Sequence, residues 1–281
     1  MLRVAVPNKG SLSEAAIEML AEAGYRQRRT TKDLVLLDAE NEVEFYYLRP
    51  RDIAVYVGSG TLDVGISGRD LVADSHADAD VVVELGFGTS TFRFAGPPGV
   101  AESVKDLAGL RVATSYAGVL ADHLAEHGVD ATVVRLDGAV ESAVQLGVAD
   151  VVADVVQTGT TLRQAGLEVF GEPILTSEAV LIKRHDVAEP AGLEQMVRRL
   201  NGVMVARNYV MMDYDIPAEA VERASALTPG LESPTVSPLA REGWVAVRAM
   251  VPRADAQRIM DQLWEVGARA ILTTDIHACR I

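Results

Sequence analysis

A strongly apolar segment that ends in a run of hydroxyl residues carries the most informative chemistry of this sequence. Residues 151–156 have the pattern of a buried strand that contains one acid, Asp154. The loop after it can turn backbone N–H groups and two or three hydroxyls inward, which binds a phosphate dianion without a lysine. Asp154 would repel that phosphate, so we expect it to face a sugar hydroxyl or a metal ion. The loop residues are Gln157, Thr158, Gly159, Thr160 and Thr161.

Simpler interpretations of this region stay open. A Thr-Gly-Thr-Thr run is also an ordinary turn followed by a helix cap. Glu141 stands in the first turn of a predicted helix, where the helix dipole favours a surface acid. The glycine spacing matches neither a dinucleotide fingerprint nor a P-loop. The five histidines are scattered and form no Ser–His–acid or Cys–His arrangement, so the sequence does not predict a covalent nucleophile.

The elements that must position these residues alternate between strands and helices. This alternation predicts an α/β fold with a largely parallel sheet, which binds its ligands at the carboxyl ends of the strands. The Ala-Gly-Pro-Pro-Gly run at 95–99 breaks the pattern, and we interpret it as a crossing between two lobes. Predicted strands cover 2–6, 43–48, 64–66, 112–114, 132–136, 151–156 and 177–182. Predicted helices cover 11–23, 52–57, a segment after 70, 119–126, 139–146 and 193–206.

The last part of the chain has a different pattern. Strands are predicted at 209–214, 244–251 and 270–276, helices at 217–227 and 253–266, and a proline-rich irregular loop between them, close to the β-α-β-β-α-β ferredoxin-like arrangement. The predicted fold class is therefore α/β, with a two-lobed core like that of periplasmic binding proteins and a C-terminal α+β ferredoxin-like domain. The predicted domains are 1–92 with 179–208 for lobe I, 93–178 for lobe II with the hydroxyl loop, and 209–281 for the C-terminal domain.

Composition limits the classes of function. The chain has 281 residues, 49% of them hydrophobic, and a net charge of −14, which indicates a globular protein that does not bind nucleic acid. No stretch approaches the roughly 20 apolar residues of a membrane span, and no signal-peptide pattern occurs. The single cysteine, Cys279, fits a reducing cytoplasm. The sequence feature most like a basic patch is the cluster of Arg26, Arg28, Arg29 and Lys32, which we interpret as a solvated turn.

The segment from Glu141 through Asp154 to Leu162 resembles the signature of the ATP phosphoribosyltransferase family. Pro-Asn-Lys-Gly at 7–10, Leu-Arg-Pro at 48–50, Gly-Ile-Ser-Gly-Arg-Asp at 65–70 and Thr-Pro-Gly-Leu-Glu-Ser-Pro-Thr at 228–235 resemble the same family. The resemblance covers the whole chain. Its C-terminal module is similar to that of the long form, which carries its own histidine-binding regulatory domain.

The resemblance implies transfer of the 5-phosphoribosyl group of phosphoribosyl pyrophosphate to N1 of ATP. The products are phosphoribosyl-ATP and pyrophosphate, and the reaction is the first step of histidine biosynthesis. The resemblance also implies Mg²⁺, inhibition by histidine and AMP, and a homo-oligomer ranging from dimer to hexamer. Displacement at the anomeric carbon requires that two anions be held in line and that the leaving group be stabilised.

The same resemblance assigns roles to residues of the core. The hydroxyl loop would bind the 5-phosphate, while Glu141 and Asp154 would hold the ribose hydroxyls, directly or through magnesium. Lys9 and Arg49 would neutralise pyrophosphate or triphosphate, although an isolated lysine in a turn is usually only solvated. The residues implied to bind the second nucleotide are Gly10, Asp70 and Tyr116, and a half-buried loop ring is the alternative for Tyr116.

In the C-terminal module the resemblance implies a histidine site. Asp215 would pair with the imidazole or amino group of the inhibitor, and capping of the following helix is the alternative role for this acid. The other residues implied to take part are Leu231, Ser233, Thr235 and Ala270. Two rival functions stay open. A two-lobed solute-binding module is expected to carry a signal peptide and no ferredoxin-like C-terminal module, the reverse of this sequence. An amino-acid sensor without catalysis would not need Glu141, Asp154 and the hydroxyl loop together.

Overall fold

The computed structural model describes residues 1–26 and 33–280, so the predicted turn at Arg28, Arg29 and Lys32 lies outside the described residues. The chain divides into two compact units, Met1–Ala21 with Tyr25–Glu194 and Glu22–Gly24 with Gln195–Ile281. The first unit contains two sheets and the second contains one. The limits given above for the two lobes and the C-terminal domain remain predictions.

A six-stranded sheet has the order β2-β3-β1-β4-β11-β5, in which β1 pairs in parallel with β3 and β4. Its central strands are continuous apolar runs, as expected where helices cover the sheet. Ile53 and Val57 of helix α2 pack with Ala5 and Val180 in one buried cluster. The strands are β1 (Leu2–Pro7), β2 (Val35–Asp38), β3 (Val43–Leu48), β4 (Val64–Gly68), β5 (Ala79–Glu84) and β11 (Ala179–Arg184), and the helices are α1 (Ser11–Glu22), α2 (Pro50–Gly58) and α3 (Arg69–Ser75).

A five-stranded sheet in the same unit has the order β10-β6-β9-β7-β8. Both of its faces are buried, because Phe92 and Phe94 belong to one apolar cluster and Ala95 and Val152 belong to another. The strands are β6 (Ser90–Gly96), β7 (Arg111–Thr114), β8 (Thr132–Arg135), β9 (Val151–Val156) and β10 (Glu168–Ser177). The helices are α4 (Ala117–Glu126), α5 (Ser142–Gln145) and α6 (Thr160–Gln164), with a 3₁₀ turn, η1 (Val104–Leu107).

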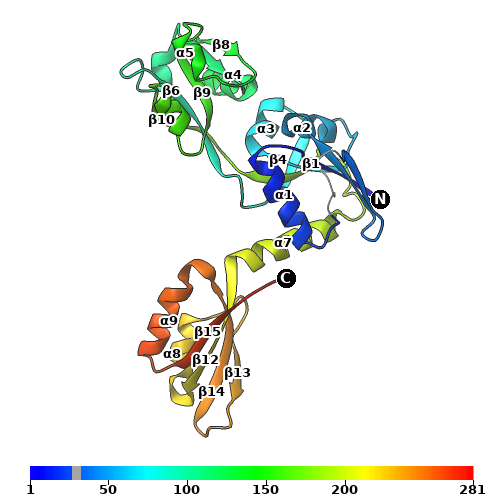
Figure 1. Cartoon of the computed structure of the whole chain (residues 1–281), viewed down its shortest axis with the longest axis vertical. Helices are drawn as coiled ribbons and strands as arrows, with labels where there is room; N and C mark the ends of the chain where they lie inside the picture. Colours follow the sequence, from blue (N-terminus) through cyan, green and yellow to red (C-terminus); the bar gives the residue numbers. More distant parts are fainter. Residues whose placement is uncertain (27–32, 281) are drawn as a thin grey trace. The chain divides into compact units, whose positions relative to one another are not determined.

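The chain crosses between these two sheets twice, first from β5 to β6 and then from β10 back to β11 (Figure 1). The crossing expected at 95–99 is wrong, since β6 runs to Gly96 inside the second sheet. The first crossing lies earlier, where Gly86 and Gly88 have φ angles of 69° and 67° that glycine adopts without strain. The return strand β11 inserts between β4 and β5, as its predicted place in the first lobe requires.

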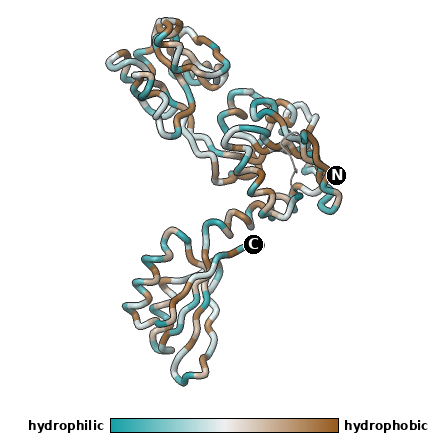
Figure 2. The backbone as a smooth tube through the Cα atoms, in the orientation of Figure 1, coloured by the Kyte–Doolittle hydropathy of each residue, from teal (hydrophilic) through white to brown (hydrophobic). Residues whose placement is uncertain are grey.

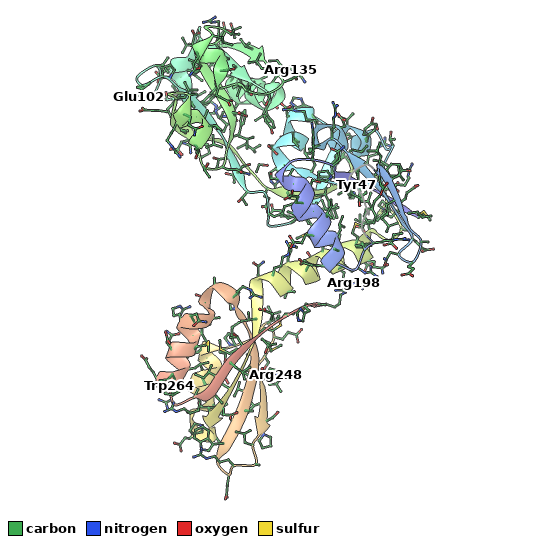
Figure 3. All side chains as sticks on the ribbon, in the orientation of Figure 1. Tyr47, Glu102, Arg135, Arg198, Arg248 and Trp264 are labelled. Carbon is green, nitrogen blue, oxygen red and sulfur yellow. The ribbon has the colours of Figure 1, made fainter. Side chains whose placement is uncertain are left out.

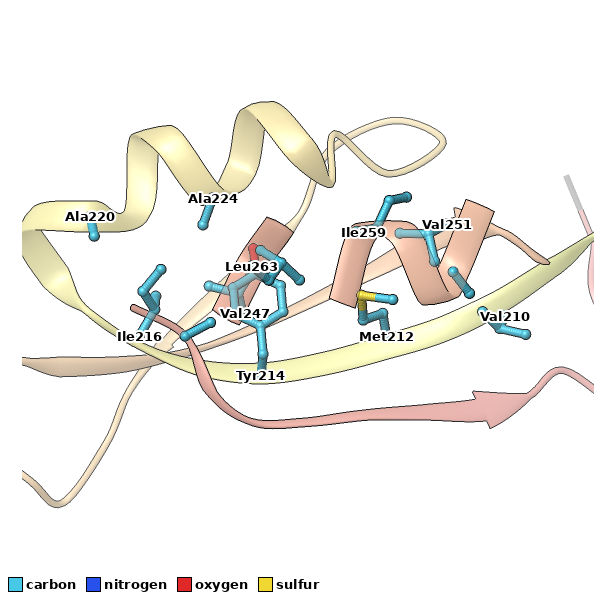
Figure 4. Packing of buried hydrophobic residues seen from close by; sticks show 12 residues of the cluster. Val210, Met212, Tyr214, Ile216, Ala220, Ala224, Val247, Val251, Ile259 and Leu263 are labelled. Atoms are coloured by element: carbon cyan, nitrogen blue, oxygen red, sulfur yellow. The ribbon is translucent and has the colours of Figure 1, made fainter. Parts of the chain in front are cut away.

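The second unit holds a four-stranded antiparallel sheet in the order β13-β14-β12-β15. One face of the sheet packs on α8 and α9 through Met212, Tyr214, Ile216 and Leu263 (Figure 4). This strand order is that of the ferredoxin-like arrangement, so the predicted fold class is confirmed. The elements are α7 (Leu193–Asn208), β12 (Tyr209–Pro217), η2 (Ala218–Ala220), α8 (Val221–Leu227), β13 (Thr235–Pro238), β14 (Trp244–Pro252), η3 (Arg253–Asp255), α9 (Ala256–Glu265) and β15 (Arg269–Asp275).

Hydrophobic and hydrophilic residues interleave along the whole trace (Figure 2). Within the described residues, none of the helices combines the length and the apolar character that a membrane crossing needs.

Candidate active site

A cavity of about 630 Å³ opens in the N-terminal unit and is lined from both of its sheets. Its size is in the range that small-molecule sites occupy. Six of the residues implicated by the sequence line it, namely Lys9, Gly10, Arg49, Asp70, Tyr116 and Gln157.

Lys9 and Arg49 come from the carboxyl ends of two neighbouring parallel strands. β1 and β3 are paired so that Pro7 lies opposite Leu48; Arg49 is the next residue after Leu48, and Lys9 is the second residue after Pro7. Arg49 is the N-cap residue of α2 and has an extended backbone, because Pro50 after it disfavours the helical conformation. The register of β1 and β3 therefore places two positive charges at one edge of the cavity, as predicted.

Asp70 is almost fully buried, at 7% exposure, in the first turn of α3. Ser177 holds it from the end of β10: the Ser177 hydroxyl donates to Asp70 Oδ1 at 2.8 Å and accepts from the Asp70 backbone N–H at 3.0 Å. A buried carboxylate that keeps hydrogen bonds has a fixed direction. Ser177 also lines the cavity, and the sequence analysis missed it because the two residues are 107 positions apart.

Tyr116 lies at the N-cap position of α4, with Arg51 from α2 stacked on it. The Arg51 guanidinium carbon is 4.7 Å from the centre of the Tyr116 ring, close enough for a cation–π contact. Burial raises the pKa of Tyr116, and the nearby Asp70 carboxylate raises it further, so the phenol stays protonated. Arg51 is a second missed residue; the signal for it was its place in the same first turn that Arg49 caps.

Asp154 and Glu141 lie within electrostatic reach of each other, and neither of them lines the large cavity. Burial raises the pKa of Asp154 to about 6, the Val155 backbone N–H counteracts this at 2.8 Å, and the neighbouring Glu141 charge raises the value again. Arg51 lowers this pKa and Asp70 raises it, so both also lie within electrostatic reach. Two neighbouring carboxylates repel each other, and a divalent cation bound between them would relieve that repulsion. Their oxygen atoms are also the ligands that Mg²⁺ prefers.

The hydroxyl loop follows Asp154 directly. Gly159 has a φ of 69° at the N-cap position of α6, a left-handed conformation that favours glycine. The Thr158 and Thr160 hydroxyl oxygens are 3.0 Å apart, and Arg163 donates to Thr160 at 3.4 Å. The loop is therefore a turn that leads into a helix, as in the simpler interpretation of the Thr-Gly-Thr-Thr run, but no threonine side chain caps α6. Arg163 adds a cation to this loop that the sequence analysis did not expect.

Of the loop, Gln157 lines the large cavity, and Thr158, Gly159, Thr160 and Thr161 do not. Thr158, Thr160 and Thr161 are exposed, so their hydroxyls are accessible to a ligand. The segment 137–139 between β8 and α5 contributes Asp137 and Gly138 to the cavity wall. Ala139 has a φ of 48° there, a strained conformation of the kind found at binding sites.

Of the residues predicted to bind histidine, Asp215 lies on the face of the C-terminal sheet that its helices leave open. Asp215 alternates with the core residues Tyr214 and Ile216, so its side chain points to that open face. In the strand pairing of β12 with β15, Asp215 lies opposite Arg269. The register shifts between Asp213 and Asp215, and Ala270, next to Arg269, has a φ of 49°. No side chain caps the turn that begins after Pro217, so the alternative role of Asp215 as a helix cap is wrong.

Thr235 is the first residue of β13, and Leu231 and Ser233 stand in the exposed loop before it. On the same face of the sheet, Arg248 extends from β14 (Figure 3) and donates to Asp213 Oδ1 at 2.6 Å. Asp213 therefore has a cationic partner in the protein, two positions before Asp215 along the strand.

Comparison with known proteins places the chain in one family along most of its length. The family model for ATP phosphoribosyltransferase matches residues 49–202, and the model for the HisG C-terminal domain matches residues 206–278. The chain is 67% identical over 285 residues to ATP phosphoribosyltransferase of Streptomyces avermitilis and 68% identical over 286 residues to that of Streptomyces coelicolor, with 100% of both chains covered in each case.

Among solved structures, the ATP phosphoribosyl transferase (HisG:HisZ) complex from Thermotoga maritima has a similar fold. The TM-score is 0.63 at 24% identity, and the match covers 73% of this chain and 98% of that chain. The length of chain that matches and the sequence identity show that the chain belongs to the ATP phosphoribosyltransferases, in the long form that carries the C-terminal domain.

Proposed function

We propose that this chain transfers the phosphoribosyl group of phosphoribosyl pyrophosphate to N1 of ATP, releasing pyrophosphate, in the first step of histidine biosynthesis. The observation that carries the proposal is the pairing of Asp154 with Glu141 beside a hydroxyl loop. In the same unit, Lys9, Arg49 and Arg51 line a cavity large enough for a nucleotide. A binding protein or sensor has no need to hold two acids with one pKa raised.

The sugar phosphate fits the corner after β9. Thr158, Thr160 and Thr161 offer hydroxyl donors and Arg163 offers a guanidinium to the 5-phosphate. Asp154 and Glu141 then face the ribose, where carboxylates accept hydrogen bonds from its hydroxyls. These two acids would hold Mg²⁺, which would supply positive charge against the negative charge that develops on the departing pyrophosphate.

The second substrate fits the cavity that Gly10, Asp70 and Tyr116 line. Asp70 is fixed by Ser177, and Tyr116 is fixed by the stacked Arg51, so both present defined polar groups to a nucleotide. In the reaction the bond from the anomeric carbon to pyrophosphate breaks while the bond to adenine N1 forms. Lys9 and Arg49 stabilise the negative charge on the departing group, and the chain needs only to hold both anions in line.

Regulation is proposed for the C-terminal unit. Asp215 presents a carboxylate on the open sheet face, and Leu231, Ser233, Thr235 and the bulge at Ala270 provide the surroundings for a bound histidine. Inhibition requires that histidine bind one state of the enzyme better than another. We propose a homo-oligomer, up to a hexamer, as the carrier of these states, with AMP competing at the nucleotide site and the enzyme acting in the cytoplasm.

The test is synthesis by the full-length protein. ATP, phosphoribosyl pyrophosphate and Mg²⁺ should yield an adduct with the mass and ultraviolet absorbance of phosphoribosyl-ATP, together with one pyrophosphate per adduct. Asp154→Asn serves as the control, with turnover reduced about 10²-fold or more if this acid positions the ribose or the metal. Tight binding of both substrates without any adduct would support a binding protein instead.

A further inference from the structure

The end of helix α4 carries a cluster of metal-ligating side chains outside the proposed catalytic site. His123, Glu126 and His127 each offer one ligand atom, and these atoms all lie within 4.8 Å of one another. The spacing explains the cluster, because residues three and four positions apart lie on one face of an α-helix. None of the three residues lines the large cavity.

The two imidazoles are held in orientations that suit a metal. His127 Nδ1 is 2.9 Å from the His123 backbone carbonyl oxygen. A carbonyl only accepts, so Nδ1 carries the proton and Nε2 presents its lone pair outward, which is the usual arrangement of a metal-binding histidine. The His123 ring is fixed between His127, at 4.3 Å between ring centres, and Phe94, at 5.8 Å.

The electrostatic surroundings also favour a cation. The cluster occupies the last turn of a ten-residue helix, where the carbonyl dipoles concentrate negative charge. No ion pair among the described residues engages Glu126, whose carboxylate is exposed and accessible.

We propose that His123, Glu126 and His127 bind one divalent transition-metal ion of the Zn²⁺ class, with water completing the coordination. Two nitrogens and one carboxylate oxygen are the ligands of a zinc site with an open position. Imidazole selects against Mg²⁺, which prefers oxygen, so this site differs in chemistry from the acid pair at Asp154. The bound ion would stabilise the last turn of α4, the helix that begins directly after Tyr116.

The test is titration of the chelator-treated full-length protein with Zn²⁺ in excess Mg²⁺, which occupies oxygen-only sites. Calorimetry should give one tight zinc equivalent, and Zn²⁺ should raise the melting temperature. The variants are His127→Gln and Glu126→Gln, both at exposed positions. For His127→Gln, zinc affinity should fall by at least on the order of 100-fold, since loss of a group that only hydrogen-bonds to a metal ligand already costs about 10–100-fold.

Controls separate this site from other ligands in the chain. His185→Gln removes an exposed histidine that pairs with Asp80, and Cys279→Ser removes the single thiol; both should bind zinc as the unmodified protein does. Replacement of Zn²⁺ by Co²⁺ should give visible absorption bands that His127→Gln abolishes. The proposal is overturned if the unmodified protein binds no zinc, if both cluster variants retain full affinity, or if Cys279→Ser alone abolishes binding.

Discussion

The Asp74 Oδ1 atom accepts a hydrogen bond from the Gly118 backbone N–H at 2.8 Å. This contact joins α3 to the first turn of α4, and so ties elements that flank different sheets. The other oxygen of Asp74 accepts from Arg51 at 3.0 Å, and Arg51 stacks on Tyr116. One carboxylate thus fixes both a cation and an aromatic ring in the wall of the cavity.

Gly118→Ala should disrupt this contact. A Cβ at residue 118 would lie 2.4 Å from the Asp74 carbonyl oxygen and 3.0 Å from the His76 ring. Since backbone must move to relieve the overlap, we expect a loss of about 1–3 kcal/mol in unfolding free energy and a higher KM for ATP. Denaturant unfolding and steady-state kinetics measure these effects. Ala121→Ser, at an exposed position of the same helix, is the control, and equal behaviour of the two variants would contradict the role of Gly118.

Asp154→Asn should lower activity but raise stability. Because the folded-state pKa of Asp154 is raised from 3.8 to about 6, its ionisation opposes folding. The penalty is absent below about pH 4, grows between pH 4 and pH 6, and is complete above pH 6, where it reaches roughly 2–3 kcal/mol. Asparagine removes the charge and still accepts from Val155, so the variant should melt higher at pH 7.5 and the same at pH 4.

Asp150→Asn, on the residue before the same strand, should do the opposite. Hydrogen bonds from Arg111 lower the pKa of Asp150, so its charged form favours folding at pH values above the unfolded pKa and loses this effect as the pH falls. Melting curves of the two variants across pH 4 to 8 should therefore diverge in opposite directions from the unmodified protein. If Asp154→Asn were instead less stable than the unmodified protein at pH 7.5, other interactions of the charged Asp154 carboxylate would outweigh the cost of burying it.

Ser177→Ala should loosen Asp70. The substitution removes a donor to Oδ1 and the acceptor for the Asp70 N–H, both in a buried setting, so we expect a loss of about 1–3 kcal/mol in stability. If Asp70 contacts the nucleotide, KM for ATP should rise several-fold while KM for phosphoribosyl pyrophosphate stays constant. Ser59→Ala, on an exposed turn, serves as control. An equal rise in the KM values for both substrates would show that Asp70 does not contact the nucleotide specifically.

Asp215→Ala should relieve inhibition by histidine with little change in uninhibited turnover. The matched control is Asp213→Ala, on the same strand and the same sheet face, whose carboxylate is already paired with Arg248. Inhibition curves at saturating substrates should shift at least about 10-fold for Asp215→Ala, as expected when a charged hydrogen-bond partner is lost. If histidine inhibits both variants equally, its site lies away from this sheet face.

Strands with continuous apolar runs were predictable, whereas partly exposed ones were not. β1, β3 and β9 were expected within one or two residues, because buried strands leave a strong pattern. The predicted strands omit β2, β5, β6 and β10; the residues of β2, β5 and β10 are mostly half-buried or exposed. β13 was taken for irregular loop because prolines surround it; as an edge strand it tolerates Pro238 at its end.

The site was predictable where strand ends define it. Arg49 and the loop after Asp154 follow from the rule that ligands bind at the carboxyl ends of strands, whereas Lys9 comes from the resemblance to a family. Ser177 depends on a contact between segments 107 positions apart, and a single sequence contains no signal for such a pair, whereas Arg51 had a signal in its place in the helical turn that follows Arg49. The resemblance to a family identified Glu141, for which spacing alone favoured a surface charge.

The position of β11 has a consequence for synthesis of the chain. Because β11 lies between β4 and β5, the six-stranded sheet cannot close until residues 179–184 have left the ribosome. Until then β4 exposes unpaired backbone groups along one side, which is a hazard for nascent chains. The five-stranded sheet, by contrast, is one uninterrupted stretch from β6 to β10 and can form first. We therefore expect the later half of the N-terminal unit to mature ahead of the half that begins it.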